Sequence, residues 1–141
     1  MISKDDWRKG GAVADSLLNE AEWAELLKIA KPKLVRQGDQ IIRTDRKLGK
    51  LFVIVRGQLS VRLDIPGRAQ AYVVQRLGPG NVIGEASLLL GGSPPANVIV
   101  DSEEAVVVRL PHKKLEEVFK AKPLIAGKFY CFIATRQAEK L

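Results

Sequence analysis

Short segments rich in Val, Ile and Leu, separated by turn residues, fill the middle of this chain of 141 residues. Glycine, proline and aspartate interrupt residues 33–109 at short intervals, as they do between strands. Closely spaced short strands are typical of a sandwich or barrel, and we expect a jelly roll here. The expected strands are residues 33–37, 40–44, 50–56, 58–63, 69–77, 96–101 and 105–110.

Helical spacing of apolar residues precedes these strands. Asn19 is a suitable N-cap, and Glu22 stands three residues later as its capping-box partner. We therefore expect a helix over residues 20–30 that is ended by Pro32. A short helix over residues 12–18 is expected before it.

Two prolines open helical patterns near the end of the chain. Pro111 and Pro123 each suit a first helical position, where the missing amide hydrogen would have no partner inside the helix. Apolar residues then recur at helical spacing and need an apolar surface to pack on. We expect one domain, with a helical lead over 1–31, a roll over 32–110 and C-terminal helices over 111–141.

The net charge of +7 permits two interpretations. The basic residues can form a solubilising surface, or they can attract phosphate. No block of like charges and no interleaved aromatic residues occur, so direct nucleic-acid binding is not indicated. No apolar run is long enough to span a bilayer, and membrane insertion is not expected.

Cysteine and histidine are each used once, as Cys131 and His112. A disulfide within the chain, a clustered metal site and a histidine-based catalytic triad are therefore not expected. The cytoplasm, a reducing compartment, is the expected location. We expect Cys131 to be buried between aromatic residues of a helix, and His112 to be exposed near the start of one.

A glycine-rich connection over residues 78–98 offers the clearest candidate for a binding site. Gly84 lets the backbone approach a ligand closely, and residues 85–90 suit a single helical turn. The first amides of such a turn have no partner inside the helix and can hold an anion, with Ser87 as a further donor. Glu85 would repel phosphate, so it is better suited to accept hydrogen bonds from sugar hydroxyls. A capped turn with no ligand is the alternative interpretation.

Several motifs follow one another in a distinctive order over nearly the whole chain. They are the turn at residues 38–39, the strand and turn at 51–57, the turn at 77–80, the segment at 83–89 and the strand at 96–101. In this order they resemble the cyclic nucleotide-binding domain family. The resemblance implies a mainly-β fold, an eight-stranded β-roll with N-terminal helix or helices and two C-terminal helices. It also implies a non-catalytic regulatory module of a larger signalling protein.

The resemblance assigns roles to residues of the connection. Glu85 would accept a hydrogen bond from the ribose 2′-hydroxyl, and backbone groups of Gly84, Ala86 and Ser87 would surround the ribose and phosphate. Ala96 is also expected among the ligand-binding residues of this site.

The resemblance also assigns contacts with the base. Asn97 would touch a guanine base, and Val73 and Val74 of the opposing hairpin would touch the base of any ligand. A residue of the last helix would cap the base, and packing against the roll is the alternative for each. The candidates for this cap are Phe129, Tyr130 and Phe132.

The sequence departs from the family where the phosphate should be neutralised. Pro94 stands nine residues after Glu85, where the family has an arginine, and Pro95 follows, where a backbone N–H normally donates. Without these two hydrogen bonds, cyclic nucleotide binding would be weaker by about 10²- to 10³-fold. Arg76 and Arg109 are the cations considered as replacements.

Three functions therefore stay open at this stage. The first is a regulatory domain that senses cAMP or cGMP through residues 84–85 and relays the signal through the C-terminal helix. The second is an altered site that binds cyclic nucleotides weakly or takes an uncharged nucleoside. The third is a protein-interaction module with no ligand. No cofactor is expected, and an enzyme is disfavoured because jelly-roll enzymes need clustered metal ligands.

Overall fold

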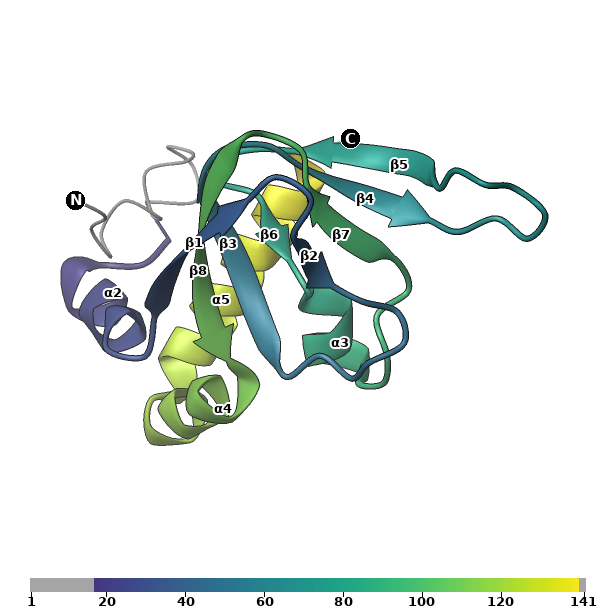
Figure 1. Cartoon of the computed structure of the whole chain (residues 1–141). Helices are drawn as coiled ribbons and strands as arrows, with labels where there is room; N and C mark the ends of the chain where they lie inside the picture. Colours follow the sequence, from purple (N-terminus) through teal and green to yellow (C-terminus); the bar gives the residue numbers. More distant parts are fainter. Residues whose placement is uncertain (1–16, 140–141) are drawn as a thin grey trace.

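Two antiparallel four-stranded sheets form the centre of the molecule, and helices flank them (Figure 1). The computed structural model describes residues 17–139. The strand order is β1-β8-β3-β6 in the first sheet and β2-β7-β4-β5 in the second. The predicted eight-stranded β-roll with flanking helices is confirmed.

The elements have the following bounds. The first sheet consists of β1 (Lys31–Arg36), β8 (Glu104–Pro111), β3 (Lys50–Arg56) and β6 (Val82–Ile83). The second consists of β2 (Gln40–Ile42), β7 (Asn97–Val100), β4 (Leu59–Leu63) and β5 (Tyr72–Leu77). The described helices are α2 (Glu20–Leu27), α3 (Glu85–Leu90), α4 (His112–Ala121) and α5 (Pro123–Ala138).

Both faces of the first sheet are covered, so its central strand β3 is apolar on both sides. Successive residues of a strand point to opposite faces. Phe52 and Ile54 therefore enter the cluster between the two sheets, whereas Leu51 and Val53 enter the cluster under the helices. All four side chains are buried. The continuous apolar run of this strand thus follows from its place between the second sheet and the helical layer.

The capping box at the start of α2 is confirmed. The Glu22 amide donates to Asn19 Oδ1 and the Asn19 amide donates to Glu22 Oε1, both at 2.9 Å. The prediction that Pro32 ends this helix is wrong, because α2 already ends at Leu27 and Pro32 lies within β1. A proline is tolerated there because β1 is an edge strand. The short helix expected over residues 12–18 falls largely outside the described residues.

Strand β6 is absent from the strands expected from the sequence. Its two residues, Val82 and Ile83, pair with Val53 and Phe52 at the edge of the first sheet. Two residues are too few to show a strand period in the sequence, and they sit inside the glycine-rich connection. They bring the residues that follow them, starting at Gly84, to the edge of the roll.

Helix α5 packs one face against α2, α4 and the first sheet. Phe129 and Phe132 are fully buried, and the Phe132 ring meets the Trp23 ring edge to face at 5.6 Å between centroids. The prediction that Cys131 is buried is wrong, because its side chain is exposed. The buried face of α5 is formed by residues 125, 129, 132, 133 and 136, and Cys131 lies off it. His112 is half-buried rather than exposed.

Neither a membrane span nor a metal cluster occurs in the described part of the chain. Over residues 17–139, no helix combines the length and apolar character needed to cross a bilayer. The same residues contain no group of three or more His, Cys, Asp or Glu side chains that could hold a metal ion.

Candidate functional site

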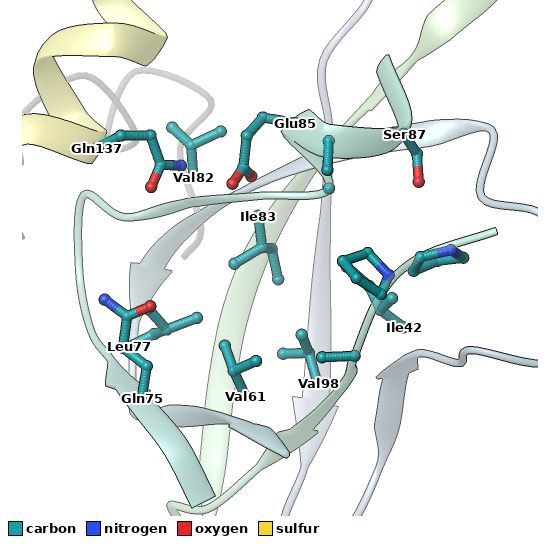
Figure 2. A pocket seen from close by; sticks show the side chains of 15 residues that line it. Ile42, Val61, Gln75, Leu77, Val82, Ile83, Glu85, Ser87, Val98 and Gln137 are labelled. Carbon is teal, nitrogen blue, oxygen red and sulfur yellow. The ribbon is translucent and has the colours of Figure 1, made fainter. Parts of the chain in front are cut away.

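A cavity of about 150 Å³ lies between α3, the inner face of the roll and the last turn of α5 (Figure 2). The side chains of the roll supply an apolar floor, and polar groups stand at the rim. The lining residues are Ile42, Val61, Gln75, Leu77, Val82, Ile83, Gly84, Glu85, Ala86, Ser87, Pro94, Pro95, Ala96, Val98 and Gln137. The glycine-rich connection over residues 78–98 thus provides two thirds of the lining residues, as the sequence predicts for a site built on it.

Gly84 fixes the position of α3 above this cavity. It is the N-cap of α3 with φ of 90°, a conformation that favours glycine. A Cβ atom there would lie 2.8 Å from Leu48 Cδ2 and 3.0 Å from the Lys50 carbonyl oxygen. The loop before β3 is therefore packed directly against the start of α3. The first amides of α3 have no acceptor within the helix by their position.

Two oxygen-bearing side chains of α3 line the cavity. Ser87 is 7% exposed, and its Oγ has no hydrogen-bond partner among the described residues. The Glu85 side chain reaches down from α3 towards the apolar floor (Figure 2). No hydrogen bond or ion pair to the Glu85 carboxylate occurs within residues 17–139. Buried polar groups normally find a partner, so the Ser87 hydroxyl marks a place where a ligand would complete the structure.

The wall beyond Ser87 is formed by the two consecutive prolines. Pro94 is buried and Pro95 is exposed, and both line the cavity. Neither has a backbone N–H to donate. Among the lining residues within the described part of the chain, Glu85 is the one charged side chain. An anion placed here would meet a carboxylate and no compensating cation.

Neither arginine considered as a replacement reaches the cavity lining. The Arg76 side chain is 74% exposed, and its Nη1 lies 3.7 Å from Asp101 Oδ2. Arg109 lines a different hollow of the roll. The site is therefore without the positive charge that the resemblance implies.

The predicted base contacts are placed differently from the expectation. Asn97 does not line the cavity, and its Oδ1 accepts hydrogen bonds from Gln40 Nε2 at 2.9 Å and from the Thr44 amide at 3.0 Å. Val73 is half-buried and Val74 is 50% exposed, and neither is a lining residue. A contact between any of these three residues and a base stays a prediction.

The last helix contributes a residue that sequence reasoning missed. Phe129 and Phe132 lie in the core, and Tyr130 is 40% exposed with its ring 5.4 Å from that of Phe119. None of the three lines the cavity, so their role as a base cap stays a prediction. Gln137 does line it, and its Nε2 is buried without a partner among the described residues. The one sequence signal for this position is its spacing of four residues from Ile133, which places the two residues on the same side of α5.

Comparison with known proteins agrees with this geometry. The family model described as "Cyclic nucleotide-binding domain" matches residues 32–122, which is more than half of the chain. The chain belongs to the cyclic nucleotide-binding domain family. Such domains are ligand-binding modules rather than catalytic ones.

Individual relatives support this assignment over different lengths. Cyclic GMP-binding protein D of Dictyostelium discoideum is 36% identical over 62 residues, which cover 44% of this chain and 5% of that protein. The matched segment therefore spans about a twentieth of this relative's length.

Solved structures resemble the fold of the cyclic nucleotide-binding domain. A domain of the same kind from Methylobacillus flagellatus superposes with a TM-score of 0.84 and 16% identity, over 96% of this chain and 76% of that one. The regulatory domain of Toxoplasma gondii PKA, solved with cAMP, superposes with a TM-score of 0.69 and 21% identity. The match covers 84% of this chain and 43% of that one. At these identities the likeness shows the fold alone.

Proposed function

We propose that this domain is a regulatory, non-catalytic sensor within a larger cytoplasmic signalling protein, and that it binds a ribose-bearing ligand in the cavity under α3. The observation that carries the proposal is the buried, unpartnered Ser87 hydroxyl in a cavity that Glu85 also lines. A carboxylate accepts hydrogen bonds and a serine hydroxyl donates one, which together suit a sugar and its substituent.

The position of Gln137 supports a route from ligand to effector. This residue belongs to α5, whereas Glu85 and Ser87 belong to α3, and all three line one cavity. A ligand that hydrogen-bonds to both helices binds best when α5 lies against the site. Binding would then shift the position of α5 and relay occupancy to domains attached beyond it.

A cyclic nucleotide, cAMP or cGMP, is the first candidate ligand. The family membership supports it, and the name of the Dictyostelium relative makes cGMP a natural probe. The missing cation lowers the expected affinity, because a charged hydrogen bond contributes about 1.5–3 kcal/mol.

An uncharged nucleoside is the second candidate, and one observation favours it. The described lining of the cavity carries the Glu85 carboxylate and no cation. Transferring a phosphate charge into such a place without a counter-charge is costly, whereas a neutral ligand avoids this cost.

The test is calorimetric titration of cAMP, cGMP, adenosine and guanosine into wild-type protein and into Pro94→Arg. The new arginine should tighten cyclic nucleotide binding about 10- to 100-fold and leave nucleoside binding unchanged, because nucleosides have no phosphate. Pro79→Arg is the matched control, since it adds the same charge at an exposed turn residue outside the cavity.

A second arm tests the ribose contact. Glu85→Ala should weaken every ribose-bearing ligand, and a 2′-deoxy ligand should bind wild type no better than the ribose form binds Glu85→Ala. Ligand at 100 times its dissociation constant should also add about 2.7 kcal/mol to the free energy of unfolding. The melting temperature should rise accordingly. No heat and no melting shift with any of the four ligands would contradict the proposal and favour the protein-interaction role.

A further inference from the structure

A second group of polar residues lies on the roll outside the ligand cavity. One hollow of about 390 Å³ is lined by Lys33, Lys50 and Arg109, and an adjoining one of about 310 Å³ by Arg46 and Lys47. The two hollows share Gln40, Ile41, Lys50 and Phe52. We call the combined surface the basic cleft.

Strand register explains why these cations meet. Lys33 pairs with Val107, and Arg109 pairs with Phe52, so the side chains of all four residues lie on the inner face of the first sheet. Lys50 stands two residues before Phe52 and shares that face. Lys33 lies opposite Val107 and Lys50 lies opposite Pro111, so the three cations run diagonally across β1, β8 and β3. With about 4.8 Å between strands and about 3.4 Å per residue, the backbone positions of the outer two are roughly 17 Å apart.

The cations of the basic cleft are largely unpaired. Lys33, Arg46, Lys47, Lys50 and Arg109 make no ion pair with a described residue. The Arg109 Nε is also buried and has no hydrogen-bond partner within residues 17–139. Like charges held together in a concave surface repel each other, and a bound anion would relieve this repulsion.

Two carboxylates lie close to these cations, and one of them, that of Asp39, lines the first hollow itself. Asp39 accepts the Arg36 amide at 2.9 Å, and Asp45 holds Arg43 through two hydrogen bonds of 3.1 and 3.0 Å. Elsewhere on the molecule, basic residues do have acidic partners, as in Arg62 with Asp101 at 2.6 Å. Basic residues without an ion pair to a described residue, such as Lys31 and Arg56, also occur outside the cleft, and what distinguishes the cleft is that it gathers several of them on one concave surface.

We propose that the basic cleft binds a free ligand with two or more phosphate groups. A single phosphate is too small to reach cations spread over three strands and a loop. The recessed guanidinium of Arg109 suits phosphate oxygens, and the lysines act as point charges around it. This site is distinct from the ligand cavity, because the linings of the two share no residue.

Inorganic tripolyphosphate is the probe, titrated into the full chain at low salt. We expect one binding event that weakens steeply as salt rises. Lys33→Gln/Lys50→Gln should weaken it about tenfold or more, because each charged hydrogen bond to the phosphates contributes roughly a decade of affinity. Arg68→Gln/Lys120→Gln is the control, because both residues are exposed, lie outside the cleft and change the net charge equally.

A second variant guards against misfolding of the first. Arg46→Gln/Lys47→Gln changes an exposed loop and should also weaken tripolyphosphate binding at an unchanged melting temperature. The proposal is overturned if the control weakens binding as much as either cleft variant, or if single phosphate binds as tightly as tripolyphosphate.

Two further arms identify the class of anion. Vesicles with a bisphosphorylated inositol lipid should bind the protein no more tightly than soluble tripolyphosphate does. Tighter vesicle binding that is lost in Lys33→Gln/Lys50→Gln would assign the cleft to a membrane lipid instead. Polyglutamate should compete weakly, and equal competition would assign it to an acidic protein segment. All these measurements are independent of nucleotide binding under α3.

Discussion

At the scale of single residues, Gly84 is the most constrained position of the site. Replacing it with alanine places a Cβ 2.8 Å from Leu48 and 3.0 Å from the Lys50 carbonyl, on a backbone with φ of 90°. We expect Gly84→Ala to lower the free energy of unfolding by more than the 1–3 kcal/mol or so of backbone strain alone. Urea denaturation measures this change.

Gly38→Ala is the matched control for that experiment. Gly38 also has positive φ, 87°, but a Cβ there meets nothing within 4 Å. It should therefore show the strain without the clash. Equal decreases in the two variants would contradict the close packing of the loop before β3 against α3.

His112 provides a prediction on pH. Burial lowers the pKa of its imidazole, and Glu116 and a hydrogen bond with the Lys50 backbone oppose the shift only in part. The folded protein therefore binds fewer protons than the unfolded chain, in which the pKa is about 6.5. The contribution of the neutral His112 side chain to the free energy of unfolding should be fully present above that pH. It should be lost as pH decreases from the unfolded pKa through the lower folded pKa.

Chemical denaturation at about pH 7.5 and pH 5.5 tests this expectation. In His112→Gln the difference in unfolding free energy between the two pH values should be smaller than in wild type. An unchanged difference would assign the pH dependence to other groups.

At the scale of elements, α5 is held by one buried face. Phe132 is fully buried against Trp23, whereas its neighbour Cys131 is exposed. Phe132→Ala should cost about 3–5 kcal/mol of unfolding free energy, because it leaves a cavity under the helix. Cys131→Ala is the control and should change it by less than about 0.5 kcal/mol. A large decrease in Cys131→Ala would contradict its placement on the outer face.

The two residues also show what a sequence can predict about an element. Helical spacing identifies α5 and its aromatic residues, and the Asn19–Glu22 spacing identifies the start of α2, because both signals are local. The exposure of Cys131 depends on which face of the helix meets the roll. That choice is made by tertiary packing, and aromatic neighbours in the sequence do not reveal it.

The same limit applies to the site. Gly84, Glu85 and Ser87 can be predicted as site residues, because a glycine turn and a helix start are recognised from neighbouring residues in the sequence. Gln137 cannot, since it reaches the cavity only through the docking of α5. Asn97 resembles a base contact by its position, but its amide is occupied by Gln40 and Thr44 from a distant part of the chain.

At the scale of the whole molecule, the cavity joins α3 to the end of α5. Gln137→Ala should weaken ligand binding by about 0.5–1.5 kcal/mol, the contribution of a neutral hydrogen bond, and leave stability nearly unchanged. Gln70→Ala, on the exposed end of the β4–β5 hairpin, is the control for titration calorimetry. Unaltered affinity in Gln137→Ala would remove α5 from the ligand contacts.

The ion pair between Lys128 and Glu22, at 2.8 Å, ties the first half of α5 to α2. The same carboxylate oxygen of Glu22 also accepts the hydrogen bond from the Asn19 amide in the capping box. Gln137 lies nine residues beyond Lys128, which is about 13 Å along a helix. A tilt of α5 with its pivot near Lys128 would preserve this anchor. The greatest travel then falls at the carboxyl end of the helix, beside the cavity.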